Sequence, residues 1–269
     1  MALRMCPRMG SGFVTQFATA SDGVKLAFER VGAGRPVLLV HGFGSSAHQN
    51  WKSTGWYGSL TEAGFGVVAM DCRGHGLSDK PHDAAFYGHD RMAEDAATVM
   101  DAAGLPSAPV VGYSMGGFIG LRLAAHYPER VTRLALGGVG EYYLRGPRIA
   151  NEGSRSALSE ALLTDDPAGI TDPRGRMFRS FADQPGKDRF ALAACMRGMS
   201  PQLPMESLAQ MTQPVLVVCG ALDDIAGAPG PLAAAFPNGN AVTVAGRDHM
   251  SAVGDRKTRQ AVVDFLLSP

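Results

Sequence analysis

Gly112-Tyr113-Ser114-Met115-Gly116-Gly117, residues 112–117, lies between an apolar run at 108–112 and a stretch of helical periodicity at 115–127. A G-x-S-x-G sequence in this setting is typical of a sharp strand-to-helix turn that presents a serine hydroxyl. The flanking glycines leave room for a strained backbone and a closely packed helix. We therefore predict that Ser114 is a nucleophile. The alternative interpretation is an ordinary glycine-rich turn that contains an incidental serine.

A serine hydroxyl needs a base, and the base needs an acid that orients it. Asp223 follows the apolar run at 214–219, and His249 follows the run at 241–245. Every other histidine precedes residue 140, so His249 is the candidate base. Asp224 competes with Asp223 because adjacent acids on one loop share the same pattern; we favour Asp223. Asp248 is interpreted as a turn residue.

A third element is a pair of backbone donors for a developing oxyanion. His41-Gly42-Phe43-Gly44 comes directly after the apolar run at 36–40. We expect the N–H of Phe43 to join that of Met115 in this pair, because the glycines on either side of Phe43 let the backbone turn sharply. The alternative is a glycine-rich turn with a buried aromatic residue. His41 is predicted to hold the loop by hydrogen bonds.

The distribution of apolar runs indicates an α/β fold. A hairpin is expected from residues 12–20 and 24–31 around the Asp-Gly turn signal at 21–23. The continuous apolar runs, which are typical of strands buried on both faces, occupy residues 36–40, 66–70, 108–112, 131–137, 214–219 and 241–245. Helical patterns lie between them, one ending at Gly104 and one beginning at Asp255. These features predict a mostly parallel sheet with helices on both faces.

Residues 140–210 depart from this alternation of strand-like and helix-like segments, because they contain no strand-like run and only short helical pieces at 155–163 and 188–199. We interpret this stretch as a helical cap inserted after the sixth strand. The core domain would then comprise residues 1–139 and 211–269. Long insertions in compact domains tend to serve as lids or binding loops, although surface decoration is the alternative.

Charge and cysteine content favour a small-molecule partner. The 25 basic residues balance the 25 acidic ones, so nothing points to nucleic acid or to an anionic membrane surface. Cys6, Cys72, Cys195 and Cys219 lack metal-ligand spacing, and we read them as free thiols in a reducing compartment. No apolar run is long enough for a membrane span, and arginines interrupt the N-terminus, so a soluble cytoplasmic protein is expected. The oligomeric state is left open, a homo-oligomer included.

Taken together, the motifs resemble the α/β-hydrolase superfamily, in its branch of esterases, haloperoxidase-like perhydrolases, epoxide hydrolases, dehalogenases and carbon–carbon bond hydrolases. The residues that carry the resemblance are His41-Gly42-Phe43-Gly44, Asp71-Cys72-Arg73-Gly74-His75-Gly76-Leu77-Ser78-Asp79, residues 112–117, Gly220-Ala221-Leu222-Asp223 and His249. The resemblance implies an eight-stranded, mostly parallel sheet with a helical cap, and a structural role for residues 71–79. Two departures are the absence of a proline after Asp223 and the presence of Arg247-Asp248 before His249.

The residue at the turn narrows the chemistry that the resemblance implies. Dehalogenases and epoxide hydrolases attack with an aspartate where this chain has Ser114, and carbon–carbon bond hydrolases usually carry asparagine where it has Tyr113. We therefore expect a serine carboxylic ester hydrolase (a carboxylesterase) that needs no metal or cofactor. The alternatives are a lactone hydrolase, a perhydrolase, or a ligand-binding sensor without turnover.

Substrate choice is expected to depend on the cap. Its basic and acidic residues are equal in number, which favours a neutral, fairly hydrophobic ester of small to medium size. The candidate lining residues are Tyr142, Tyr143, Met177, Phe178, Phe181 and Met196. The alternative for each is plain core filling.

Overall fold

The computed structural model describes residues 14–145 and 152–269. Its sheet has eight strands, which are β1 (Thr15–Thr19), β2 (Lys25–Val31), β3 (Arg35–Val40), β4 (Phe65–Met70), β5 (Ala108–Tyr113), β6 (Val131–Gly137), β7 (Val215–Gly220) and β8 (Gly239–Val244). Their order across the sheet is β1-β2-β4-β3-β5-β6-β7-β8. Strand β2 pairs antiparallel with both β1 and β4, and all the remaining pairs are parallel. The predicted eight-stranded, mostly parallel sheet is confirmed.

The opening hairpin is also present, as β1 and β2, although residues 12 and 13 of the predicted segment lie outside the described part. Strand β8 begins two residues before the apolar run at 241–245. The reason is its pairing with β7, in which Gly239 lies opposite Val215. A polar residue therefore enters the strand because ladder hydrogen bonds, and not hydrophobicity, decide where this edge strand starts.

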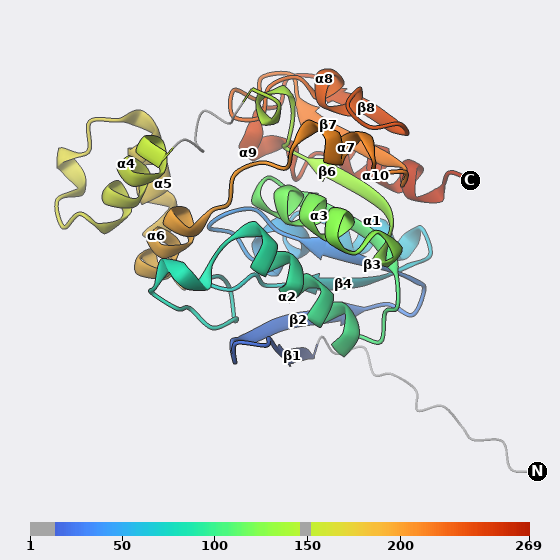
Figure 1. The fold of residues 1–269 in the computed structure, drawn as a ribbon, viewed down its shortest axis with the longest axis horizontal. Helices are drawn as coiled ribbons and strands as arrows, with labels where there is room; N and C mark the ends of the chain where they lie inside the picture. The colour runs from blue at the N-terminus through green and yellow to red at the C-terminus, as the bar shows by residue number, and fades with distance from the viewer. Residues whose placement is uncertain (1–13, 146–151) are drawn as a thin grey trace, which may run out of the picture.

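Helices cover both faces of the sheet (Figure 1). They are α1 (Trp56–Glu62), α2 (His89–Ala102), α3 (Met115–His126), α4 (Glu152–Leu163), α5 (Pro173–Ala182), α6 (Arg189–Gly198), α7 (Met205–Ala209), α8 (Pro229–Ala233), α9 (His249–Ala252) and α10 (Arg256–Leu267). Shorter turns are η1 (His48–Lys52), η2 (Ala84–Phe86), η3 (Pro128–Arg130), η4 (Glu141–Tyr143) and η5 (Pro167–Gly169). Helices α2, α3 and α8 pack on one face of the sheet, and α1 and α10 pack on the other.

The two faces explain why the strands are apolar without alternation. In β3, Leu38 and Val40 join the core beneath α2 and α3, whereas Val37 and Leu39 join the core beneath α1 and α10. Successive side chains of a strand point to opposite faces, so a strand covered on both sides needs apolar residues at every position. The sheet thereby becomes a rigid platform whose carboxyl edge carries the loops described below.

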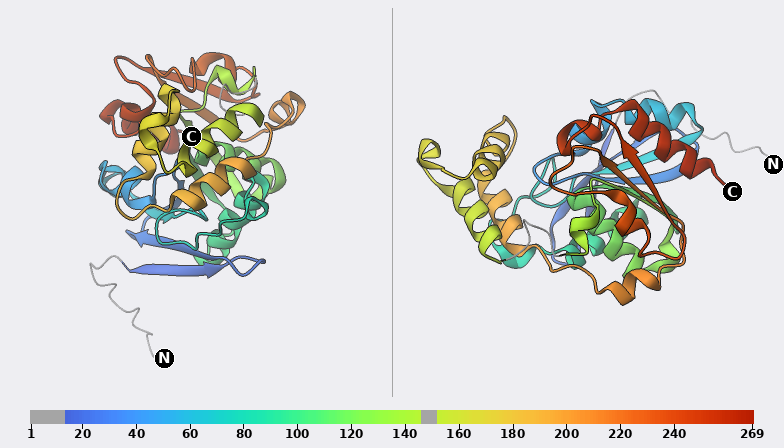
Figure 2. Two further views of the ribbon diagram at one scale, coloured as in Figure 1. Left: turned by 90° about the vertical axis from the view of Figure 1, so that its left-hand side faces the viewer. Right: turned by 90° about the horizontal axis from the view of Figure 1, so that it is seen from above.

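Helices α4, α5 and α6 stand beyond the sheet on one side, to the left in Figure 1 and again in the right-hand view of Figure 2. They follow β6, as the sequence indicated, and bury a small apolar cluster of their own that includes Leu162, Ala182 and Leu192. Sequence analysis missed α5. Its signal is Asp172, which caps the helix by accepting from two backbone N–H groups, followed by Pro173 at the first helical position. Residues 146–151 of the predicted cap lie outside the described residues.

Candidate active site

Ser114 occupies the turn between β5 and α3. Its φ of 51° makes it the one residue other than glycine with a positive φ in the described part of the chain. The neighbouring glycines are required sterically: a Cβ on Gly116 would lie 2.0 Å from the Val40 carbonyl oxygen, and one on Gly112 would lie 2.2 Å from the Gly116 carbonyl oxygen. The backbone is therefore held in a costly conformation by close packing of helix α3 against the sheet. Ser114 is half-buried at the helix N-terminus.

The Ser114 hydroxyl lies 3.0 Å from His249 Nε2, and His249 Nδ1 lies 2.9 Å from Asp223 Oδ2. Because a carboxylate can only accept, Nδ1 carries the proton and Nε2 presents its lone pair to the serine O–H. Backbone N–H groups of Ile225 and Ala226 donate to Asp223 Oδ1, which holds the carboxylate in place. The structure thus brings together three side chains from three separate loops at the carboxyl edge of the sheet.

The geometry distinguishes the two adjacent acids that the sequence left open. Asp223 is buried against His249, whereas Asp224 is exposed to solvent. The second departure from the family pattern, Arg247-Asp248 before His249, also has a structural explanation. Asp248 caps helix α9, which begins at His249, and its carboxylate accepts from the N–H groups of Met250 and Ser251.

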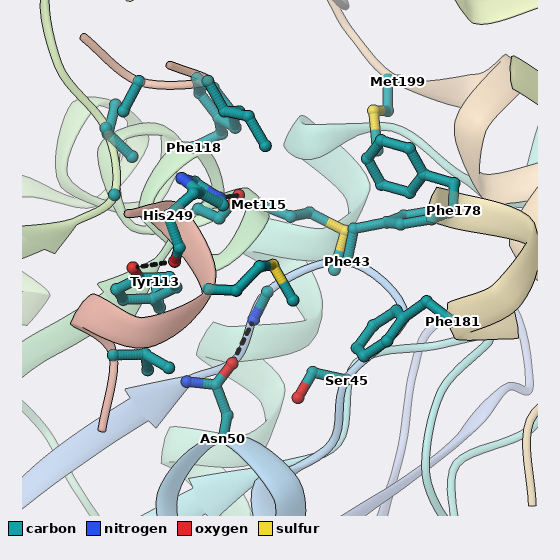
Figure 3. Close-up of a pocket in the computed structure, with 18 of the residues that line it drawn as sticks. Phe43, Ser45, Asn50, Tyr113, Met115, Phe118, Phe178, Phe181, Met199 and His249 are labelled. Carbon is teal, nitrogen blue, oxygen red and sulfur yellow. Dashed lines mark hydrogen bonds between the residues drawn. The ribbon is translucent and has the colours of Figure 1, made fainter. Parts of the chain in front are cut away.

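A contact that the sequence did not reveal involves Tyr113. Its hydroxyl donates a 2.6 Å hydrogen bond to the backbone carbonyl of His249. Burial, with the nearby charge of Asp223 as a smaller cause, raises the pKa of Tyr113 well above its usual value, so the hydroxyl stays a donor. The residue before the serine therefore anchors the loop that carries the histidine (Figure 3).

The loop after β3 lies directly against Ser114. A Cβ on Gly42 would lie 3.5 Å from Ser114 Cβ, which shows how closely the two segments approach. The N–H of Gly42 donates to Asn50 Oδ1 at 3.1 Å, a bond visible in Figure 3. The N–H groups of Phe43 and Met115 have no acceptor among the described residues. Phe43 and Met115 both border the same cavity as Ser114, so the assignment of their N–H groups as an oxyanion pair stays a prediction.

His41 fixes this loop by two hydrogen bonds. Its Nδ1–H donates to the Gly42 carbonyl oxygen at 2.7 Å, and its Nε2 accepts from the Cys72 N–H at 3.0 Å. Burial lowers the pKa of His41 to about 4, so the imidazole is neutral and can both donate and accept. This arrangement agrees with the structural part predicted for His41.

The segment 71–79 is fixed by buried polar contacts. Asp71 accepts from the N–H groups of Ala47 and Leu77, at 2.7 Å each. Arg73 forms a bidentate pair with the buried Asp95. These bonds leave both side chains engaged within the fold, in keeping with the structural role that the resemblance implied.

A cavity of about 530 Å³ opens above Ser114 and His249. Its walls are mainly apolar, and Figure 3 shows Phe43, Phe178 and Phe181 gathered on one side of it. All six residues predicted from the cap border this cavity, namely Tyr142, Tyr143, Met177, Phe178, Phe181 and Met196. Tyr143 and Met196 are also buried in the core, so for these two the core-filling interpretation holds as well.

Sequence analysis missed two polar side chains, those of His89 and Gln202, in the part of the cavity that Phe118 borders. His89 and Gln202 both border the cavity, and each has a buried Nε2 atom without a partner among the described residues. Burial, with a smaller contribution from the positive charge of Arg122, lowers the pKa of His89 to about 4. The imidazole at this position is therefore neutral. No sequence signal singles out either residue, because they come from unrelated segments.

Neither a metal site nor a membrane span stands out in the described part of the chain. Over residues 14–145 and 152–269, no three His, Cys, Asp or Glu side chains are grouped so that they could hold a metal ion. Within the same ranges, no helix has the length and apolar character needed to cross a bilayer. Cys72, Cys195 and Cys219 are free and buried, and Cys6 lies outside the described residues.

Known proteins resemble this chain in sequence and in structure. Over 120 residues it is 32% identical to bifunctional epoxide hydrolase 2 of Mus musculus, a match that covers 44% of this chain and only 21% of that protein. A hydrolase of known structure from Pseudomonas aeruginosa PA01 is 27% identical, with a TM-score of 0.72 over 94% of this chain and 98% of that chain. A thermophilic esterase from Thermogutta terrifontis is 25% identical, with a TM-score of 0.75 over 95% of this chain and 98% of that chain.

The family assignment rests on a match to a family model. Residues 35–208, which are more than half of the chain, match the family model described as the alpha/beta hydrolase fold. The match includes the loop after β3, the turn at Ser114 and the helices that follow β6. This chain belongs to the alpha/beta hydrolase fold family.

Proposed function

We propose that this protein is a serine hydrolase that cleaves carboxylic esters by two-step acyl transfer. The observation that supports it most is the continuous hydrogen-bonded chain from Ser114 through His249 to Asp223, with 3.0 Å between the hydroxyl and the imidazole. A serine hydroxyl is a weak nucleophile on its own, and a histidine held in one tautomer is the usual means of activating it.

In the first step, Ser114 Oγ attacks the ester carbonyl carbon while His249 Nε2 takes its proton. The imidazolium that forms is stabilised by the Asp223 carboxylate, and it returns the proton to the departing alkoxide. An acyl-serine remains. In the second step, His249 takes a proton from water, hydroxide attacks the acyl carbon, and the proton returns to Ser114 as the acid leaves.

The N–H groups of Phe43 and Met115 would stabilise the negative oxygen in both steps. Both donors lack an acceptor among the described residues, so they need not be released from another bond. Removal of one donor from such a pair typically costs on the order of a hundredfold or more in rate. Apart from the ester and one water molecule, each step as written uses groups of this chain.

We further propose that the chain divides into a core of residues 1–139 and 211–269 and a cap of residues 140–210. The support is the position of α5, from which Met177, Phe178 and Phe181 reach the cavity. Their apolar character, together with Phe43 on the facing loop, favours a neutral, fairly hydrophobic small-molecule ester.

The test is turnover of chromogenic short- and medium-chain esters by the parent protein and by Ser114→Ala. Ser207→Ala is a matched control, because Ser207 is half-buried on α7, away from the cavity. We expect many turnovers by the parent and by the control, and none by Ser114→Ala. If the parent releases no more than about one equivalent of product, the alternative of a ligand-binding sensor without turnover is favoured. If Ser114→Ala is as active as the parent, Ser114 is not the nucleophile.

A further inference from the structure

The cavity extends away from Ser114 along helix α3. Ser114, Phe118 and Arg122 are spaced by four residues, and the last two border the cavity with the serine. Residues four apart lie on one face of a helix. At 1.5 Å per residue, the Arg122 position lies roughly 12 Å along the helix from Ser114. The cavity therefore has a far end well removed from the reacting atoms.

This far end is built from three segments that are tied to one another. The N–H of His89, at the start of α2, donates to Ser200 Oγ at 2.9 Å. Arg122 donates to the Pro201 carbonyl and pairs with Asp90 at 2.9 Å. The positions of α2, α3 and residues 200–202 are thus fixed relative to one another before any ligand arrives.

Two polar atoms in this otherwise satisfied cluster have no partner. They are His89 Nε2 and Gln202 Nε2, both buried, in residues that border the cavity. Buried polar groups are normally hydrogen-bonded, and those that are not need a specific explanation. The His89 ring lies 5.3 Å from the Phe118 ring, measured between centroids, so it is held on the side of α3 that faces the cavity.

We propose that the far end of the cavity binds a hydroxyl group of the substrate, so that the preferred esters carry a hydroxyl roughly 6 to 12 Å from the scissile carbonyl, the range set by the helical positions of Phe118, against which His89 packs, and of Arg122. This assignment of esters rests on the function proposed above. A hydroxyl both donates and accepts, so it satisfies a neutral imidazole nitrogen and an amide N–H at once. It does so for either tautomer of His89, because the hydroxyl can accept from the Gln202 N–H while it donates to, or accepts from, His89 Nε2.

A carboxylate fits this position less well. A carboxylate would have to give up its hydration, and Arg122, which borders the cavity, is already paired with Asp90 and with a backbone carbonyl. A ketone fits only in part, because it accepts but cannot donate. The chemistry of the cluster therefore favours an uncharged group that acts as donor and acceptor.

The test measures binding to Ser114→Ala, so that it does not depend on turnover. The ligands are methyl decanoate, methyl 10-hydroxydecanoate and methyl 9-oxodecanoate, with dissociation constants from titration calorimetry. We expect the hydroxy ester to bind about 5- to 150-fold more tightly than methyl decanoate, the range expected for two net hydrogen bonds. The keto ester should fall between the two.

Two added substitutions locate the effect. Gln202→Met keeps the length of the side chain and removes the amide, and His89→Phe keeps an aromatic ring against Phe118 and removes both nitrogens. Each removes one of the two hydrogen bonds and should lower the preference for the hydroxy ester by about two- to twelvefold. Gln210→Met, at the exposed end of α7, is the matched control and should leave the preference unchanged. Thermal melts identify any variant that has lost its fold.

Equal affinity of Ser114→Ala for the hydroxy and the plain ester, or no binding of the hydroxy ester, overturns the inference. So does a preference that survives both Gln202→Met and His89→Phe. Keto and hydroxy esters that bind equally tightly overturn the hydroxyl assignment in favour of an acceptor group. If the preference is present but the parent protein hydrolyses no ester, the binding site stands and the proposed function fails.

Discussion

The adjacent acids Asp223 and Asp224 offer a sharp test of the site, because the same chemical change can be made at both. In Asp223→Asn, Oδ1 can still accept from the N–H groups of Ile225 and Ala226, as the carboxylate does now. The amide NH₂ would then replace Oδ2, which lies 2.9 Å from His249 Nδ1. Two donors cannot share that contact, so the imidazole must move its proton to Nε2.

The expected loss of kcat follows from the protonation of His249 Nε2 in this variant. A protonated Nε2 faces Ser114 Oγ at 3.0 Å as a donor and cannot take the serine proton. A change of this kind in a Ser-His-Asp arrangement lowers kcat by about ten-thousandfold. KM should change little, because Asp223 lies behind His249 and is not among the residues that border the cavity. Asp224→Asn alters an exposed carboxylate and should change kcat by less than about twofold.

The assay is steady-state ester hydrolysis by the parent and both variants, with thermal melts to show that each is folded. We expect kcat of Asp223→Asn to fall at least a thousandfold while Asp224→Asn resembles the parent. If Asp223→Asn kept more than a tenth of the parent kcat, or if both variants lost activity equally, the assignment of Asp223 as the orienting acid would be wrong.

Three further predictions concern stability. Gly116→Ala would place a Cβ 2.0 Å from a backbone carbonyl oxygen of β3 and should lower the free energy of unfolding by about 2 kcal/mol or more. Gly230→Ala is the control, because Gly230 has open space around it, and should be near neutral. Thermal melts that show similar losses for both variants would contradict the close packing at Gly116. Arg73→Met leaves the buried Asp95 without its bidentate partner and should lower the free energy of unfolding, measured with urea, by about 3–5 kcal/mol. A loss below about 1 kcal/mol would contradict this prediction. Burial lowers the pKa of Lys187 to about 8, so between pH 8 and about 10.5 the unfolded chain binds more protons than the folded chain, and the free energy of unfolding should rise with pH across that window. The rise should be smaller in Lys187→Met. Identical pH profiles of the melting temperature for the parent and the variant would refute this prediction.

Much of the fold could be predicted because its determinants are local. Gly104 ends α2 with a φ of +67°, and Asp255 caps α10 by accepting from the Lys257 N–H, both as the pattern indicated. Continuous apolar runs predicted strands buried on both faces, because each side of the sheet demands its own set of side chains. Helix α5 was missed because three arginines and a glycine among its ten residues lower its overall hydrophobicity, although its apolar residues keep a helical spacing.

By itself, the sequence determined the order of elements and the loops on which Ser114, Asp223 and His249 lie, since strand period, turn chemistry and helix caps act over a few residues. Only the tertiary structure decided which side chains meet. Ser114 and His249 are 135 residues apart, and their contact depends on where β5 and β8 lie in the sheet. The sequence pattern could not separate Asp223 from Asp224, because burial of one and exposure of the other follows from the direction of the loop after β7. The far end of the cavity likewise joins His89 to Gln202 through packing alone, and packing between distant segments leaves no periodic signal along a single chain.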